Sequence, residues 1–224
     1  MERGDRELHR DGIVCVTNRK LCRGDGRPAD QIFLQRISEI AECHPAGIIL
    51  REKDLSESGY ETLAIQVMDI CSSHGVQCIL HSFTDVALKL KAQALHVPLP
   101  VLRGMTAEQK ASFRVLGASC HSVEDAREAE RLGCTYITAG HIFDTDCKRG
   151  LPGRGLDFLR EVCVSVDIPV YAIGGITPVN ATNVRRAGAA GICVMSSLMQ
   201  CEDPAAEMKA FSASLHTRAL ETCR

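Results

Sequence analysis

Cys134-Thr-Tyr-Ile-Thr-Ala-Gly-His-Ile-Phe-Asp-Thr-Asp-Cys-Lys-Arg-Gly-Leu-Pro-Gly-Arg-Gly155 is the stretch that decides the fold. Its start is apolar and β-branched, which is typical of a buried strand, and a helical pattern begins near Leu156. Between them lies a loop rich in glycine, hydroxyl and cationic residues, with His141 where the strand ends. In barrels of alternating strands and helices, the loops after strands carry the chemistry. The stretch therefore predicts a strand–loop–helix unit that presents a candidate acid/base.

Short apolar segments of the same kind recur along the chain and alternate with helical patterns, which predicts a single-domain (β/α)8 TIM barrel. A doubly wound open sheet is the alternative. We expect the barrel domain to span residues 12–216, with frayed tails at 1–11 and 217–224. The expected strands are Ile13–Thr17, Gly47–Leu50, Gln77–His81, Ala94–Val97, Arg114–Ala118, Cys134–Ala139, Val170–Ile173 and Gly191–Met195.

The helical patterns between these strands have apolar stripes and start signals. The clearest stripes are Tyr60, Leu63, Ala64, Val67, Met68 and Cys71, and then Phe33, Ile37, Ile40 and Ala41. Residues 106–109 and 122–125 resemble capping boxes. Thr177-Pro178 and Asp203-Pro204 each place a capping side chain before a proline, which predicts a helix that begins at that proline.

Composition excludes several classes of protein. The chain has 224 residues, 45% of them hydrophobic and 24% charged, which is ordinary for a globular domain. A formal net charge of −2 makes nucleic acid and anionic membrane poor partners. No apolar run approaches the roughly 20 residues needed to span a bilayer. The charged N-terminus lacks the apolar core of a signal peptide, so we expect a cytoplasmic protein.

The chain contains 12 cysteines, without Cys-x-x-Cys or zinc-finger spacing. Cys15, Cys78 and Cys193 lie in apolar segments, where a thiol acts as a small hydrophobe. We therefore expect reduced thiols and no metal site. Cys147, in the loop of His141, is the one cysteine whose position would suit a reactive thiol.

Glycines and serines follow the last two expected strands. Gly174 and Gly175 end residues 170–175, and Ser196 and Ser197 follow the strand that begins at Gly191. Glycine lets backbone N–H groups approach an anion, and a helix N-terminus adds a favourable dipole. Because these loops hold phosphate in many such barrels, they predict a phosphate site, although a tight turn and helix caps would look the same.

Cations follow the second strand. Alternation along an extended segment places Arg51 and Lys53 on one side and Glu52 on the other. Two cations at the barrel mouth would bind a carboxylate or phosphate. A solvated charged loop is the alternative interpretation.

His141 is the best candidate acid/base because it follows Gly140 at a strand end, near Thr145, Lys148 and Arg154 in sequence. Histidine gives and takes protons near neutral pH. A lone histidine is nevertheless more often structural. We rank the other histidines below it: His9, His44, His74 and His216 near termini or helix ends, and His81, His96 and His121 at or beyond strand ends.

Three motifs resemble the thiamin phosphate synthase superfamily, and within it the TenI-type thiazole tautomerases. They are Ser119-Cys-His-Ser-Val-Glu-Asp, the run from Gly140 to Gly155, and Ala172-Ile-Gly-Gly-Ile-Thr-Pro178. The resemblance spans about residues 13–215. The sequence around His141 is similar to the TenI pattern, whereas the synthases usually have proline at the position of His141.

The chain departs from the synthase pattern at the positions of its magnesium ligands. Ile49 replaces the glutamine of Gln-x-Arg-x-Lys, with Arg51 and Lys53 retained. His81-Ser82 replaces an Asn-Asp pair, and residues 98–101, Pro-Leu-Pro-Val, replace a stretch with a second aspartate. A serine and a valine cannot replace carboxylates, since a hard cation needs anionic oxygens. The sequence therefore favours the tautomerase branch.

The resemblance implies a carboxylated, non-aromatic thiazole phosphate as the substrate and needs no cofactor or metal. Removing the ring C2 proton and reprotonating the exocyclic carbon yields the aromatic ring. The implied roles are His141 as proton shuttle; Gly174, Gly175, Met195 and Ser196 on the phosphate; Arg51, Lys53 and Lys148 on the carboxylate or developing charge; and Ser119 on the ring. The alternatives are a thiamin phosphate synthase with unusual magnesium ligands and a non-catalytic thiazole-phosphate-binding regulatory protein. A homo-oligomer is compatible with the sequence.

Overall fold

The protein is a closed barrel of eight parallel strands, each paired with its neighbours in chain order, and β1 closes onto β8. The structure, a computed structural model, describes residues 8, 12–22, 26, 28–145, 148 and 150–216. Closure confirms the barrel and excludes the open sheet, and the strand ends lie within two residues of those expected. The strands are β1 Gly12–Val16, β2 Gly47–Leu50, β3 Cys78–His81, β4 Ala94–Pro98, β5 Val115–Cys120, β6 Tyr136–Gly140, β7 Val170–Ile173 and β8 Gly191–Val194.

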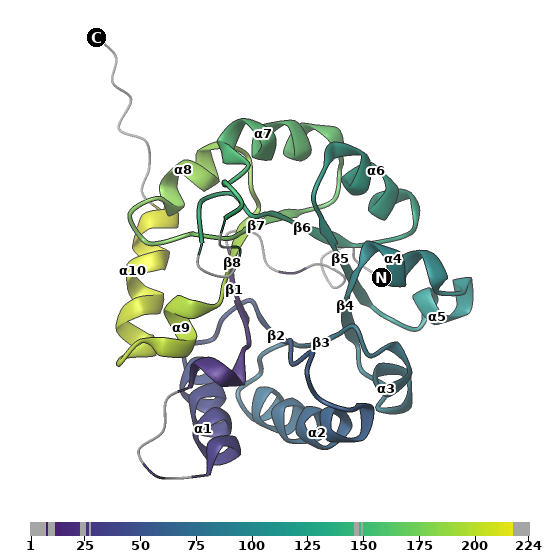
Figure 1. Ribbon diagram of the computed structural model, residues 1–224, viewed down its shortest axis with the longest axis vertical. Coiled ribbons are helices and arrows are strands. Elements are labelled where there is room, and N and C mark those ends of the chain that lie inside the picture. Colours follow the sequence, from purple (N-terminus) through teal and green to yellow (C-terminus); the bar gives the residue numbers. More distant parts are fainter. Residues whose placement is uncertain are drawn as a thin grey trace.

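Helices surround the barrel in chain order, so that each strand is followed by a crossover on the outside (Figure 1). They are the short 3-10 helix η2 Arg19–Leu21 and the α-helices α1 Ala29–Glu42, α2 Glu57–Ser73, α3 Thr84–Lys89, α4 Leu99–Gly104, α5 Ala107–Ala111, α6 Val123–Arg131, α7 Gly155–Ser165, α8 Ala181–Arg186, α9 Ser196–Gln200 and α10 Pro204–His216. Within the described part of the chain, no helix combines the length and apolarity that a membrane span requires.

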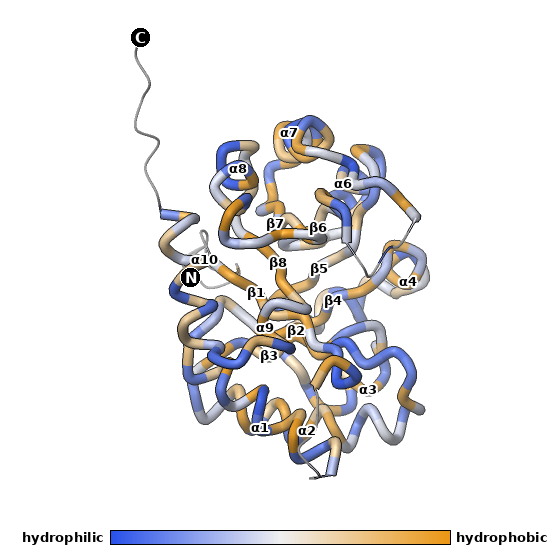
Figure 2. Tube along the Cα trace, turned by 60° about the vertical axis from the view of Figure 1, so that its left-hand side comes forward, coloured by the Kyte–Doolittle hydropathy of each residue, from blue (hydrophilic) through white to orange (hydrophobic). Residues whose placement is uncertain are grey.

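Two apolar clusters form the core, and strand alternation decides which residues enter each. Ile48 and Leu50 of β2 face the helices, whereas Ile49 between them faces the barrel interior. The interior is closed by Tyr136 and Tyr171, which meet edge to face with ring centroids 5.8 Å apart. The strands are accordingly the most continuously hydrophobic part of the trace (Figure 2). A filled interior is a packed core and not a pore.

The expected stripes form the inner faces of α1 and α2. Phe33, Ile37, Ile40 and Ala41 are buried, as are the members of the α2 stripe other than Met68, which is partly buried. Of the residues in the two expected tails, the structure describes Leu8, which is buried in the barrel interior. The remainder of residues 1–11 and all of 217–224 lie outside the described residues.

Three of the four predicted helix starts are confirmed, one of them with a different hydrogen-bond partner, and the fourth is wrong. Thr106 and Gln109 form a reciprocal capping box, and Asp203 accepts from the first N–H groups of α10. Ser122 caps α6, but the Asp125 carboxylate accepts from the N–H of His121 instead of that of Ser122. The prediction for Thr177-Pro178 is wrong, because α8 begins only at Ala181. The Thr177 carbonyl instead accepts from Asn180 and Ala181 in a preceding turn.

Candidate active site

A cavity of about 400 Å³ opens at the carboxyl ends of the strands. Side chains in the last residues of all eight strands and in the loops that follow them line it, because parallel strands bring the same end of each strand to one rim. The cavity brings together all nine residues proposed from the sequence: Arg51, Lys53, Ser119, His141, Lys148, Gly174, Gly175, Met195 and Ser196.

His141 directly follows β6 and is half-buried at the rim. Its Nε2 lies 3.2 Å from the carbonyl oxygen of Leu151, on the same loop. A carbonyl oxygen only accepts, so Nε2 carries the proton of this bond and Nδ1 of the neutral ring is the acceptor. The loop thus fixes one tautomer and leaves the other ring nitrogen as a base.

The His141 loop is held against the end of β7 by backbone hydrogen bonds. Ile142 N–H donates to the carbonyl of Ile173, and Phe143 N–H donates to that of Gly174, each at 3.0 Å. A Cβ on Gly174 would overlap His141, and one on Gly175 would overlap the backbone of Asp144. Both glycines also have positive φ, 100° and 66°. Close packing against this loop therefore requires glycine at both positions. The sequence predicted these glycines as part of a phosphate site but gave no sign of this packing.

Two further histidines, ranked low from sequence, form the deep wall of the cavity. His81 and His96, on β3 and β4, are buried, and their rings stack with centroids 5.8 Å apart. Burial lowers the pKa of His81 to about 2, helped by His96 and Lys53, and burial lowers the pKa of His96 to about 3. Both rings are therefore neutral at physiological pH. In the sequence, their positions at the ends of adjacent expected strands were the sign that they could line the mouth.

Hydrogen bonds fix the deep pair and a third histidine in place. His96 Nδ1 lies 2.9 Å from the Tyr136 hydroxyl, and its Nε2 lies 2.9 Å from the Ser119 hydroxyl. The Nδ1 of His121, on the rim, lies 2.9 Å from the Gly140 carbonyl, so that nitrogen carries the proton. Ser119, proposed to orient the ring of a ligand, is thus oriented by His96.

Another part of the cavity wall is cationic. Arg51, Lys53 and Lys148 line it, and burial lowers the pKa of Lys53, with Arg51 and Lys148 adding to the effect. The predicted alternation is confirmed for Glu52, which is 2% exposed and points away from the cavity into contacts with Thr17. Clustered cations in a partly enclosed site bind an anionic group.

The cysteines of the cavity are not poised to react. Burial raises the pKa of the Cys120 thiol to about 12 and raises that of Cys193 as well. The thiolate is the reactive form, so both are inert near neutral pH. The ten cysteines that the structure describes are free thiols. Cys147, the candidate reactive thiol, lies outside the described residues.

The fold and the site together define a (β/α)8 barrel protein with a cationic mouth and a histidine at its rim. Residues 13–198 match the thiamine monophosphate synthase family, and the chain belongs to that family. It is 35% identical over 209 residues to thiamine-phosphate synthase 2 of Streptococcus pneumoniae TIGR4, covering 91% of this chain and 95% of that protein. It is 34% identical over 220 residues to the thiamine-phosphate synthase of Roseiflexus sp. RS-1, covering 95% and 89%.

Solved structures agree with this family. The thiamine phosphate pyrophosphorylase of Pyrococcus furiosus superposes with a TM-score of 0.75 at 25% identity, covering 94% of this chain and 96% of that one. A 3-hexulose-6-phosphate synthase superposes with a TM-score of 0.67 at 16% identity, a likeness of fold alone.

The residues present do not fit the magnesium ion of the synthases. The two aspartate positions hold Ser82, whose hydroxyl lies 2.7 Å from His81 Nδ1, and Val101 on α4. No Asp or Glu is among the described residues that line the cavity. Across the described chain, no group of three His, Cys, Asp or Glu side chains could hold a metal. Magnesium prefers carboxylate oxygens, which the described lining of the mouth does not offer.

Proposed function

We propose that this member of the family is a thiazole tautomerase, which isomerises a carboxylated thiazole phosphate from the exocyclic-double-bond form to the aromatic form. One observation carries the proposal. The described cavity lining combines His141, whose Nε2 bonds to the Leu151 carbonyl, with three cations and with glycine and serine that follow β7 and β8, and it includes no Asp or Glu. This set suits proton transfer on an anionic substrate better than metal-assisted expulsion of diphosphate.

The reaction moves one proton and needs no net charge change. In the proposed mechanism, Nδ1 of His141 removes the proton from ring C2, and the resulting imidazolium returns a proton to the exocyclic carbon. Electron density released at C2 moves through the ring toward the exocyclic carbon, and the ring becomes aromatic. Arg51, Lys53 and Lys148 would stabilise the negative charge on the substrate that exists between the two transfers.

The two ends of the cavity would hold the two anionic groups of the substrate. Gly174, Gly175, Met195 and Ser196 lie at the ends of β7 and β8, where such barrels bind phosphate. Ser196 opens α9, so its backbone N–H is among those without an intrahelical partner. The carboxylate would then face Arg51 and Lys53, and Ser119 would contact the ring. Binding both ends fixes C2 relative to His141.

The test is direct. The purified protein is incubated with the non-aromatic thiazole carboxylate phosphate, and the rise of aromatic absorbance is followed without added metal. We expect catalysed aromatisation that saturates with substrate. Absorbance that rises no faster than in a tube without protein would overturn the proposal and favour a non-catalytic binding protein.

Thiamin phosphate synthesis is the second candidate, and the names of the curated relatives favour it. That reaction joins a pyrimidine diphosphate to thiazole phosphate and expels diphosphate. With Ser82 and Val101 at the aspartate positions, the described lining offers a diphosphate cations but no carboxylate that could hold magnesium. Those cations could bind a diphosphate but could not reproduce the coordination geometry of magnesium. Detection of thiamin phosphate as the product would favour this candidate.

A further inference from the structure

We propose that Glu52 is a positioning residue: its buried carboxylate anchors the loop after β2, so that Arg51 and Lys53 reach the anion held at the mouth. The identity of that anion as a substrate carboxylate rests on the proposed function, whereas the anchoring does not. No function described above uses Glu52, although it is a buried acid beside the cationic wall.

The Glu52 carboxylate is 2% exposed and fully engaged. Its Oε1 accepts from the Thr17 hydroxyl at 2.7 Å and from the Arg19 backbone N–H at 3.0 Å. Its Oε2 accepts from the same N–H at 3.1 Å and from the Arg19 guanidinium at 3.3 Å. A carboxylate is held out of water only when charged and polar donors compensate the lost hydration, as they do here. The anchor is therefore rigid.

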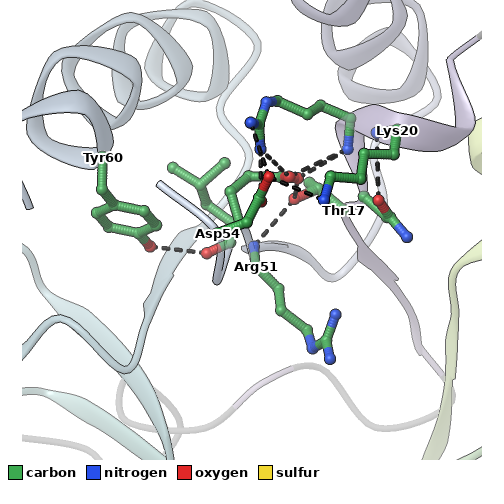
Figure 3. Close-up of polar contacts among 9 residues, drawn as sticks. Thr17, Lys20, Arg51, Asp54 and Tyr60 are labelled. Carbon is green, nitrogen blue, oxygen red and sulfur yellow. Dashed lines mark hydrogen bonds and ion pairs between the residues drawn. The ribbon is translucent and has the colours of Figure 1, made fainter. Parts of the chain in front are cut away.

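Thr17 connects this anchor to the backbone of Arg51. The carboxylate of Glu52 only accepts, so the Thr17 proton points at Glu52. The hydroxyl oxygen is then free to accept from the Arg51 backbone N–H, at 2.9 Å. Figure 3 shows this chain of contacts, with the Arg51 side chain extending away from the cluster. Glu52 thus fixes the backbone position from which the Arg51 side chain departs.

The loop sorts its charges onto two faces. Asp54 repeats the outward contact of Glu52, with Oδ1 and Oδ2 accepting from the Arg19 guanidinium at 2.7 and 2.9 Å and an ion pair to Lys20 at 3.0 Å. Hydrogen bonds from Arg19 and Lys20 hold the pKa of Asp54 below its usual range. Both acids therefore contact η2, on the side of the loop that faces away from the cavity. Arg51 and Lys53 line the cavity.

The cationic wall needs such an anchor because its members repel one another. The lowered pKa of Lys53, caused by burial and by Arg51 and Lys148, shows that the wall is unfavourable for further positive charge. Without an outer anchor, the loop would relieve this repulsion by moving its cations toward solvent. Glu52 holds them in place before a ligand arrives, which preorganises the site.

The variants are chosen to remove the anchor with little change of shape. Glu52→Gln is isosteric but places an amide N–H₂ against the donors of Thr17 and Arg19. Thr17→Val removes the hydroxyl that links Glu52 to Arg51, and Thr17→Ser keeps it. Glu61→Gln is the matched control, since Glu61 forms an ion pair with Lys89, 2.7 Å away on the surface.

Two readouts separate positioning from general damage. The first is the Arg51 Nε–H resonance and its heteronuclear NOE in ligand-free protein. The second is calorimetric affinity for the aromatic thiazole carboxylate phosphate and for the same phosphate without the carboxylate. We expect the Arg51 side chain to become mobile in Glu52→Gln and Thr17→Val. Its Nε–H resonance should then be averaged over several conformations, and its heteronuclear NOE should fall. The two variants should lower the affinity for the carboxylated ligand about 10-fold, and the affinity for the ligand without the carboxylate less than about twofold. Thr17→Ser and Glu61→Gln should behave like wild type.

Each other result has a definite meaning. An Arg51 resonance that is unchanged in both anchor variants would overturn the inference, and so would equal weakening of the two ligands. Wild-type protein that does not distinguish the two ligands would contradict the proposed substrate, while the Arg51 resonance would still decide the anchoring. Should Glu52→Gln fail to fold, the comparison of Thr17→Val with Thr17→Ser decides.

Discussion

The two halves of the mouth both contain histidines, but they place them in different environments. On the β3–β5 side, His81 and His96 are buried and stacked, and their pKa values are lowered to about 2 and about 3. On the β6–β8 side, His141 is half-buried and bonded through one ring nitrogen to a backbone carbonyl. Desolvation keeps the deep pair neutral, so that pair can only shape and hydrogen-bond. We infer that proton transfer falls to the histidine at the rim.

Replacement of the rim histidine should have the largest effect. His141→Asn should lower kcat for aromatisation by about 10²- to 10⁴-fold, the usual contribution of a general acid/base. Phosphate binding and thermal stability should change little, because the side chain is half-buried at the rim, where its Nε2 bonds to a loop carbonyl. The measurement is kcat by aromatic absorbance.

His216→Asn is the matched control, since His216 also hydrogen-bonds a backbone carbonyl, at 2.8 Å, but at the end of α10. It should leave kcat unchanged. If His141→Asn kept more than about half of wild-type kcat, the role of proton shuttle would pass to another group, with His121 or Cys147 next in line.

Loss of a phosphate contact on the same side should act on binding and not on the chemical step. Ser196→Ala removes one hydrogen bond to a charged group, which costs about 1.5–3 kcal/mol, and KM should rise about 10- to 100-fold. The phosphate group makes the same contact in the ground state and in the transition state, so kcat should not change. Steady-state kinetics separates the two, and a fall in kcat at constant KM would contradict this placement of the phosphate.

The deep half should appear in the pH dependence of stability. Unfolded histidine titrates near pH 6.5, whereas His81 and His96 in the folded protein titrate at about 2 and about 3. Below pH 6.5 the unfolded chain therefore binds protons that the folded chain does not. Stability is full above that pH and falls as the pH drops toward 3, by up to ~1.4 kcal/mol per pH unit for each histidine.

His96→Asn tests this assignment. Urea unfolding between pH 7 and pH 5 should give a shallower loss of stability for the variant than for wild type, whatever its stability at pH 7. Parallel slopes would show that His96 is not held neutral by the fold.

The barrel and the site positions could be predicted from sequence because both depend on local pattern. Strand alternation, helix stripes and residues at strand ends located the mouth, and the family resemblance completed the set of nine proposed residues. Other features depend on contacts between distant segments. The overlap of Gly174 with the His141 loop joins β7 to β6, and the Glu52 anchor joins the loop after β2 to Thr17 at the end of β1.

The deep histidine pair was underestimated for the same reason. Sequence shows His81 and His96 at strand ends but not how far burial shifts their protonation. The predicted start of α8 failed because the side chain of Asn180 accepts from the Thr177 N–H and stabilises a turn there. A threonine–proline pair alone does not distinguish that turn from a helix cap.

The central claim is that this mouth moves a proton and does not expel diphosphate. The most direct measurement places both reactions in one tube: purified protein, non-aromatic thiazole carboxylate phosphate, pyrimidine diphosphate and excess magnesium, with products separated by chromatography. The account predicts the aromatic thiazole carboxylate phosphate as the product, with the pyrimidine diphosphate unconsumed. Accumulation of thiamin phosphate with release of diphosphate would contradict the account and identify the chain as a synthase.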